Sequence, residues 1–437
     1  MNRRVNHQSV SHKHLCTPAQ HVMSRRRLLG ASAATGLLGM GGLGGLVQPL
    51  IADELVQSDK QVLFIWIDGG MSQLESWDPK PNTQFGGPFR SIQTTLPGIR
   101  VSELMPKTAE IMHLLALDRG VTTVDNSHSA GVPRIQRGDP KDRGVIYPYF
   151  GSAVAKLMGQ GKSPLPPYIW VKPGSGGFKY QDAGFLGPRY GALAIGDGKA
   201  PPNLLLPETL SHDANSARNR LRDFANEQYA VGRNPTFGEA QSFVFDSAQA
   251  LMKRQSLFLD PDPADVKLYG DTELGRDMLI GRKMLEAGVR FVKVNSYGWD
   301  THGDNFNGHA SLMPRFDQAF SAVVLDLEQR GMLDNTLVIA MSEFGRTPRI
   351  NGHVGRDHWP EAWSIVMTGT GIQRGVVIGE TNKTGTFVEN DAHDIGDFFH
   401  TWFSALGVNS SETEYLNNGQ PLPIAHDDCR PIKELLT

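Results

Sequence analysis

The sequence has few cysteines and no excess of basic residues, and each shortage excludes a class of protein. Its 437 residues include only Cys16 and Cys429, and Cys16 lies in an N-terminal segment that we expect to be removed. A single remaining cysteine cannot form an internal disulfide, so a disulfide-stapled fold is excluded. The 43 Lys and Arg residues are outnumbered by 46 Asp and Glu residues. Nucleic acid is therefore excluded as a partner, because phosphate backbones select basic surfaces.

The first fifty residues contain no acid and carry six Lys or Arg residues. The sequence SRRRLL at 24–29 precedes a glycine-rich, weakly apolar run. A basic segment, an apolar segment and a small residue such as Ala52 are typical of a secretory signal, and the paired arginines resemble the twin-arginine type. A membrane anchor needs about 20 strongly apolar residues. We therefore expect residues 1–52 to be a cleaved export signal, which leaves a periplasmic or extracellular protein with no stable membrane span.

Short apolar stretches alternate with helical patterns from about residue 58 onwards. The stretches that we predict as strands are 62–68, 114–123, 168–172, 290–295, 336–341 and 363–369. This alternation is typical of a largely parallel sheet that helices cover on both faces. The sequence therefore predicts an α/β fold over residues 58–437, with three layers in the order α/β/α and a large, mostly parallel central sheet.

Two further stretches have apolar residues at helical spacing and end at a glycine. The first has its apolar stripe between Phe316 and Leu327 and is stopped by Gly331, and the second covers 395–406 and is stopped by Gly407. Such stripes usually face a core, and glycine commonly follows a helix end. Residues 173–275 are rich in glycine, proline and charge, and we expect a loop-rich and helical insertion there.

Residues that suit metal binding follow the ends of predicted strands. Asp68 follows the first strand, Asp300 and His302 follow the fourth, and Glu343 follows the fifth, while His358 precedes the last strand. Ligand chemistry in open α/β sheets lies at the carboxyl ends of the strands, so we expect these residues to converge. Each one alone is equally well explained as an ordinary loop residue. Together, carboxylate and imidazole ligands suit Zn or Mn, and carboxylates alone suit Ca.

Several segments resemble one known superfamily in the right order. The sequence DNTLVIAMSEFG at 334–345 resembles the DNTLVIFTSDNG strand and loop of sulfatases and, more broadly, of the alkaline phosphatase superfamily. The sequence VLFIWIDGG at 62–70 is similar to its opening strand, and 368–379 and 393–408 are similar to its late turn and closing helix. The segments WDTH, SEFGRTP and GRDHW are most similar to the DUF1501 group of exported proteins. The resemblance spans about 60–437 and implies an alkaline phosphatase-like fold.

The resemblance also implies roles for the candidate ligands. Asp68 and Glu343 would bind one divalent metal ion, although the superfamily has Asp at the position of Glu343. Asp300, His302 and His358 would bind the other ion. His302 departs from the pattern, because it follows Asp300 by two residues where many members of the superfamily use four.

The nucleophile is expected at a helix start after the second strand, where the superfamily has Ser, Thr or a modified Cys. The corresponding sequence is DNSHSAG at 125–131, in which Ser127 and Ser129 are candidate nucleophiles and His128 is a candidate ligand or acid. The alternative is that this stretch is only a capped loop. The motif C-x-P-x-R is missing from the sequence, so the formylglycine chemistry of true sulfatases is excluded.

Two arginines and one phenylalanine bear on the choice of function. Arg134 and Arg346 would bind sulfate or phosphate oxygens through the guanidinium fork, or else form ordinary ion pairs. Phe344 occupies the place of a His or Asn ligand and cannot bind a cation. Phe344 therefore weakens the case for two bound metal ions.

The leading hypothesis is an exported metal-dependent hydrolase of phosphate or sulfate esters, with a small-molecule or glycan ester as substrate. The alternative is a catalytically degenerate protein that binds an anionic ligand, and Phe344 favours it. A mutase or isomerase acting on phosphorylated sugars also fits the first strand, but export argues against it because such substrates are cytosolic. The sequence carries no signal for the oligomeric state.

Overall fold

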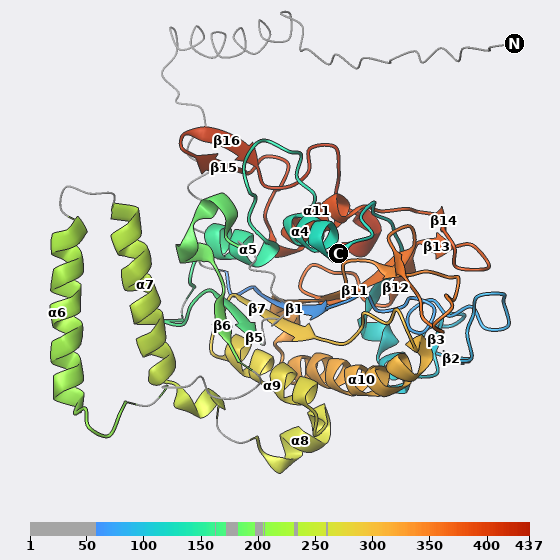
Figure 1. Ribbon diagram of the computed structural model, residues 1–437, viewed down its shortest axis with the longest axis horizontal. Coiled ribbons are helices and arrows are strands. Elements are labelled where there is room, and N and C mark those ends of the chain that lie inside the picture. Colours follow the sequence, from blue (N-terminus) through green and yellow to red (C-terminus); the bar gives the residue numbers. More distant parts are fainter. Residues whose placement is uncertain are drawn as a thin grey trace, which may run out of the picture. The chain divides into compact units, whose positions relative to one another are not determined.

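An eight-stranded sheet lies at the centre of the computed structural model (Figure 1). The structure describes residues 58–161, 163–171, 182–196, 204, 206–230, 235–258 and 261–437. These residues belong to Ala52–Thr437, one of the two units into which the chain divides. The predicted export signal at residues 1–52 lies outside the described residues.

The predicted α/β fold with a mostly parallel sheet is confirmed. Across the sheet the strands are β12 (Val376–Ile378), β4 (Ala116–Val121), β11 (Trp363–Gly369), β8 (Thr336–Met341), β1 (Gln61–Ile67), β7 (Phe291–Ser296), β5 (Tyr168–Val171) and β6 (Leu193–Ile195). Strand β11 runs antiparallel to both of its neighbours, β4 and β8. The other neighbouring pairs are parallel.

Every stretch that the sequence predicts as a strand forms one, with ends that differ by at most two residues. The central strands β7, β8 and β11 are buried along their whole length, which explains the largely apolar sequences of β8 and β11. The strands β6 and β12 at the two edges of the sheet have three residues each. The sequence pattern misses them because three residues are too few to show a period.

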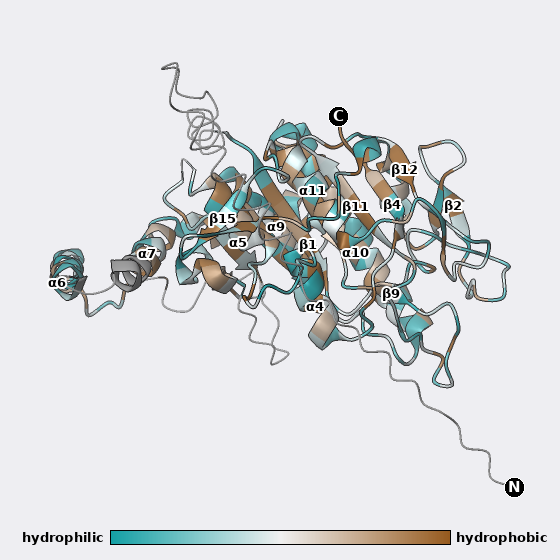
Figure 2. Cartoon of the chain, turned by 90° about the horizontal axis from the view of Figure 1, so that it is seen from above, coloured by the Kyte–Doolittle hydropathy of each residue, from teal (hydrophilic) through white to brown (hydrophobic). Residues whose placement is uncertain are grey.

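Helices cover both faces of the sheet, as the three-layer prediction requires. Alternate residues of β1 point to opposite faces: Leu63 and Ile65 join one apolar core, and Val62 and Phe64 join the other. The first core lies under α3 (Pro106–Glu110), α9 (Glu273–Glu286) and α10 (Asn305–Gln329), and the second lies under α4 (His128–Arg137), α5 (Phe150–Met158) and α11 (Ile395–Leu406). Figure 1 shows α9 and α10 on one side of the strands and α4, α5 and α11 on the other, and Figure 2 shows β1 and β4 coloured largely in the brown of hydrophobic residues.

The two predicted helices are confirmed, and so are their ends. Helix α10 contains the stripe from Phe316 to Leu327 and ends just before Gly331, which has a φ of 66°. Helix α11 begins with a capping box formed by Asp394 and Asp397 and ends at Gly407 with a φ of 87°. Positive φ is the reason that glycine stands at both ends, since other residues rarely adopt it.

The remaining described elements lie outside the central sheet. They are α6 (His212–Ala230), α7 (Pro235–Met252), α8 (Pro263–Tyr269) and the strand pairs β2 (Ser91–Gln93) with β3 (Arg100–Ser102), β9 (Gly345–Arg346) with β10 (His358–Trp359), β13 (Glu380–Thr381) with β14 (Val388–Asn390) and β15 (Glu414–Asn417) with β16 (Gln420–Pro423). The range 173–275, predicted as an insertion, contains β6, α6, α7 and α8. Among the described residues, no helix has both the length and the apolar character needed to cross a membrane.

A fully buried ion pair fixes the loop that precedes β10. Arg356 donates to the two carboxylate oxygens of Glu75 at 2.9 and 2.7 Å, and both side chains have an exposed fraction of 0%. Arg356 also donates to the backbone carbonyl oxygens of Thr347 and Phe85 at 3.1 and 2.8 Å. One side chain thus joins the loop between β9 and β10 to the loop after β1, and its buried charge is balanced by a single carboxylate.

We expect Arg356→Ala to lower the free energy of unfolding by about 3–5 kcal/mol, because it leaves the Glu75 carboxylate buried without its partner. Urea denaturation followed by circular dichroism measures this change. The control is Arg349→Ala, which removes an exposed arginine from the same loop region. Equal unfolding midpoints for the two variants would contradict the prediction.

Candidate metal-binding site

The candidate carboxylates lie at the edge of the sheet where the parallel strands end. Asp68 follows β1 directly, Asp300 lies in the loop after β7, and Glu343 lies two residues after β8. The backbone N–H of Asp68 donates to the carbonyl oxygen of Ser296, the last residue of β7, at 2.8 Å. Strand pairing therefore continues up to the first candidate ligand and fixes its position relative to the loop that carries Asp300.

Two histidines reach the same edge, one just before the reversed strand β11 and one after β4. Because β11 is antiparallel to β8 and β4, it begins where those strands end. His358 lies five residues before β11 and so stands at this edge. Strand β4 leads from the same edge into α4, whose first residue is His128.

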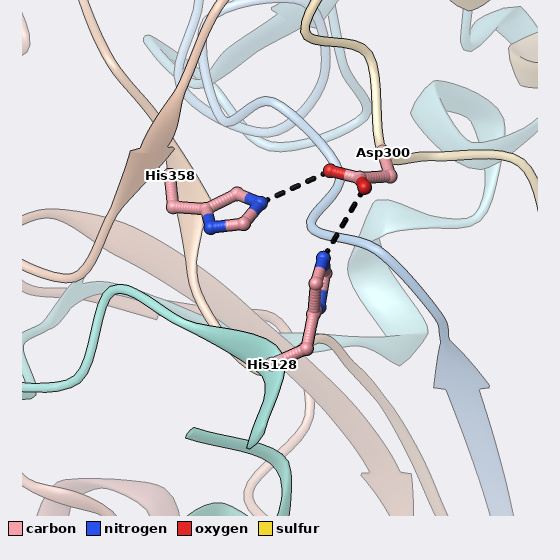
Figure 3. Close-up of side chains that lie close together, drawn as sticks. All are labelled: His128, Asp300 and His358. Carbon is pink, nitrogen blue, oxygen red and sulfur yellow. Dashed lines mark hydrogen bonds and ion pairs between the residues drawn. The ribbon is translucent and has the colours of Figure 1, made fainter. Parts of the chain in front are cut away.

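His128, Asp300 and His358 come together from three separate segments (Figure 3). One potential ligand atom from each lies within 4.8 Å of the others. The Nε2 atom of His128 lies 3.3 Å from Oδ2 of Asp300, and the Nε2 atom of His358 lies 3.0 Å from Oδ1. The predicted convergence of Asp300 and His358 is thus observed as geometry, with His128 as a third member.

His302 joins this cluster from the loop that also carries Asp300. Its Nε2 atom lies 3.2 Å from Oδ1 of Asp300 and 3.0 Å from Nε2 of His358. Its Nδ1 atom lies 2.7 Å from a carboxylate oxygen of Asp357, which orients the ring. Sequence reasoning gave Asp357 no role. Its position beside His358 in the sequence was the available signal.

Glu343 and Asp68 form a more deeply buried part of the site. Glu343 is fully buried, and its Oε1 atom accepts a hydrogen bond from the backbone N–H of Gly69 at 3.1 Å. Burial and, next, the nearby Glu343 carboxylate raise the pKa of Asp68 to about 6. Two neighbouring carboxylates repel each other, and this repulsion favours a cation beside them.

His128 supplies positive charge between the two halves of the site. Its Nδ1 atom lies 2.7 Å from Oε1 of Glu343, while Nε2 faces Asp300. Hydrogen bonds to Asp300 and then to Glu343 raise the pKa of His128 to about 9. Burial alone would raise the pKa of Asp300, but the hydrogen bonds from His128, His358 and Arg346 hold it well below its usual range.

Phe344 fills the place where the resemblance implies a metal ligand. Its side chain is fully buried and stacks on the ring of His358 with a centroid distance of 4.2 Å. Gly70 passes so close to it that an added Cβ atom would lie 2.9 Å from the Phe344 ring. The aromatic ring thus orients a candidate ligand and makes one side of the site apolar.

Both candidate anion-binding arginines make ion pairs within the protein. Arg346 is fully buried and donates to the carbonyl oxygens of Gly69, Gly70 and Arg356 and to Oδ1 of Asp300. The side chain of Arg134 on α4 forms ion pairs with Asp125, Asp139 and Asp394 and is 23% exposed. In this arrangement Arg346 positions Asp300, and Arg134 ties α4 to its surroundings.

The two candidate nucleophiles lie at the start of α4. Ser127 is the N-cap residue, but its side chain makes no capping hydrogen bond. Its Oγ atom lies 3.5 Å from Oγ of Ser129, which is exposed. The Ser127 hydroxyl therefore stands at a helix N-terminus without the structural role that serine usually has there.

Sequence reasoning missed a buried lysine behind the site. Lys293 lies in the middle of β7, has an exposed fraction of 1%, and donates to Oε1 of Gln136 on α4 at 2.6 Å. Its ammonium lies 4.0 Å from the centre of the Trp170 ring. Burial lowers its pKa to about 7, opposed chiefly by Asp68. The sequence signal for this buried lysine was its position between two valines of a predicted strand.

We expect Lys293→Met to flatten the pH dependence of stability. Between the folded pKa of about 7 and the ordinary value of 10.5 the unfolded chain binds more protons, so this lysine makes the unfolding free energy rise with pH. Urea denaturation at several pH values between 7 and 10 measures the slope, and Lys383→Met, at an exposed position, is the control. An unchanged slope in Lys293→Met would refute the assigned pKa.

The chain is similar to several solved structures and to one protein family. Structures to which it is similar include the PsFucS1 sulfatase from Pseudoalteromonas sp. (13% identity, 87% of this chain and 74% of that chain covered, TM-score 0.38). A second is a protein in the alkaline phosphatase superfamily from Vibrio parahaemolyticus (12% identity, 82% of this chain and 75% of that chain covered, TM-score 0.34). A third is the C-terminal periplasmic domain of EcEptC from Escherichia coli in complex with Zn (10% identity, 87% of this chain and 96% of that chain covered, TM-score 0.38). The search of curated proteins found no match. The model of the family described as "Protein of unknown function (DUF1501)" matches residues 59–436, so the chain belongs to the DUF1501 family.

Proposed function

We propose that this protein is an exported, metal-dependent hydrolase of phosphate or sulfate esters. The observation that carries the proposal is the convergence of Asp300, His302 and His358 at the carboxyl edge of the sheet. Their nearest ligand atoms lie 3.0, 3.0 and 3.2 Å apart. The export signal predicted at residues 1–52 is consistent with action outside the cytoplasm.

The donor set fits a divalent transition metal. Around a tetrahedral ion with bonds of about 2.0–2.2 Å, neighbouring ligand atoms lie about 3.3–3.6 Å apart, so a small outward movement of these three side chains accommodates the ion. Imidazole with carboxylate suits Zn or Mn better than Ca. When bound, such an ion polarises an ester oxygen and helps a hydroxyl to ionise.

A second ion would be held by Asp68 and Glu343. Both carboxylates lie beside the first group, and the charge of Glu343 adds to burial in raising the pKa of Asp68, so a cation beside Asp68 would be favourable. His128 contacts Glu343 and Asp300 and would act either as a ligand to one ion or as a fixed positive charge. This pair completes the two-ion arrangement that phosphoryl and sulfuryl transfer uses.

The nucleophile in this proposal is Ser127. Its Oγ atom attacks the phosphorus or sulfur atom, its proton passes to water, and the alcohol of the ester leaves with a proton taken from water. Attack of water on the resulting serine ester then releases phosphate or sulfate and restores the hydroxyl. Free backbone N–H groups at the start of α4 favour an anion at this position, and Arg346 keeps Asp300 in place.

A second candidate function is supported by Phe344 and His128. Phe344 occupies the place of a ligand, and the His128 ring links the two carboxylates that would otherwise share an ion. A chain with one cation or none would still bind a phosphorylated or sulfated ligand at the start of α4. In that case the protein would be a binding protein without turnover.

We expect about two metal ions per chain in the purified protein after incubation with Zn or Mn. Asp300→Ala and Asp68→Ala should each lose at least one equivalent, because each removes a carboxylate from one group of ligands. Elemental analysis measures the content. The matched control is His353→Gln, which changes an exposed histidine of the neighbouring loop. One ion would favour the binding protein, and no bound ion after reconstitution would exclude the hydrolase.

We expect Ser127→Ala to lower kcat about a hundredfold or more on nitrophenyl phosphate or nitrophenyl sulfate, because the variant lacks the attacking oxygen. Ser129→Ala is the matched control and should stay within about threefold of the parent protein. Metal content measured in parallel separates loss of the nucleophile from loss of the ions. Full activity in Ser127→Ala would assign the attack to another group.

A further inference from the structure

Helix α6 stands at the outer side of a helical hairpin and exposes most of its surface. Figures 1 and 2 both show α7 between α6 and the central sheet. Among the described side chains, α6 contributes polar groups to its contact with α7: Asn226 donates to Ser242 at 3.3 Å, and Arg222 forms an ion pair with Asp246 at 3.6 Å and lies 4.7 Å from the centre of the Phe245 ring. The side of α6 that faces α7 is thus its polar side, an inversion of the usual pattern.

The apolar side of α6 faces away from α7 and is exposed. Ala214, Ala217, Leu221 and Phe224 follow one another at spacings of three and four residues, as the core positions of a coiled coil do. Leu221 is 68% exposed and Phe224 is 58% exposed. All four belong to one stripe, and among the described residues nothing covers it.

We propose that this stripe pairs α6 with α6 of a second copy of the chain, in antiparallel orientation, to form a homodimer. In this pairing Leu221 of one copy packs against Phe224 of the other, and the small Ala217 lets the helices approach closely. A two-fold axis relates the copies, so the same patch serves both of them.

Charges beside the stripe select a second copy in this orientation. Arg218 and Arg220 are exposed at the middle of α6, and Glu227 is exposed toward its end. None of the three has an ion-pair partner among the residues that the structure describes. Arg220 and Glu227 lie on the same flank of the stripe, and antiparallel pairing about a point between Leu221 and Phe224 sets Arg220 of each copy beside Glu227 of the other. Parallel pairing would set arginine against arginine, which costs stability.

The overall charge of α6 argues against an anionic membrane as the partner. Its three arginines, Arg218, Arg220 and Arg222, are balanced by Asp213, Asp223 and Glu227, so the helix is neutral. Surface-bound amphipathic helices depend on a basic polar face, which this helix does not offer. A neutral helix with separated charges of both signs is complementary to itself.

The expected interface is modest. Helix α6 has 19 residues, which corresponds to a length of about 28 Å. A single pair of such helices lies at the low end of stable interfaces, so we expect a dissociation constant on the order of micromolar.

Sedimentation velocity on the purified protein from about 1 to 100 μM tests the proposal. We expect the parent protein to shift from monomer to dimer across this range, and the double variant Leu221→Glu/Phe224→Glu to remain monomeric with unchanged helical content by circular dichroism. The control is Ser216→Glu, which adds a charge at an exposed position of α6 outside the stripe. A parent protein that stays monomeric, or a dimer that survives the double variant, overturns the proposal.

Charge reversal provides a test of the orientation. Glu227→Arg should weaken the dimer about tenfold or more, and adding Arg218→Glu and Arg220→Glu to it should restore the affinity, because the opposite signs then face each other again. Failure of the triple variant to recover overturns the antiparallel register. If the parent protein binds anionic lipid vesicles without forming dimers, and Leu221→Glu/Phe224→Glu does not bind them, the homodimer proposal is overturned. The stripe would then bind a membrane surface.

Discussion

The buried guanidinium of Arg346 is the interaction on which the rest of the site depends. It donates to the carbonyl oxygens of Gly69 and Gly70 after β1, to that of Arg356 before β10, and to the Asp300 carboxylate after β7. Three loops that end or begin at different strands are thereby held at fixed distances. A buried cation with a partner on each loop makes it costly to move any one of them separately. The relative positions of the candidate ligands follow from this one side chain.

Much of the fold could be predicted because its signals are local. The strands β8 and β11 are largely apolar runs that lie between two layers of helices, and the ends of α10 and α11 carry the glycines that positive φ requires. The convergence of Asp68, Asp300 and Glu343 followed from one topological rule, since the carboxyl ends of parallel strands share an edge. The direction of β11 could not be read from its sequence, because a strand buried on both faces has the same composition in either orientation.

The chemical details of the site were less predictable because they depend on contacts between distant segments. The sequence offered Arg346 as a binder of substrate, whereas its position under three loops uses its donors within the protein. His128 was a candidate ligand or acid, and only the fold brings it between Glu343 and Asp300. Lys293 was visible as a charge within an apolar strand, but its hydrogen bond to Gln136 on α4 depends on how α4 packs on the sheet. Pairwise geometry of this kind has no local sequence signature.

The balance of charge connects these details. Asp68, Asp300 and Glu343 bring three carboxylates to one edge of the sheet, and Arg346, His128 and Lys293 are the cations around them. Arg346 forms an ion pair with Asp300 and His128 contacts Glu343, while burial and the Glu343 carboxylate raise the pKa of Asp68. With His or Asn as a ligand at position 344, a bound metal ion would directly balance the negative charge of Asp68 and Glu343. With Phe344 there, the ion must be held by fewer groups, or the imidazolium of His128 must take its place, and the fold accommodates both solutions. Whether the proposed function is that of an enzyme or of a binding protein therefore depends on which cation, a metal ion or the imidazolium of His128, lies beside Glu343.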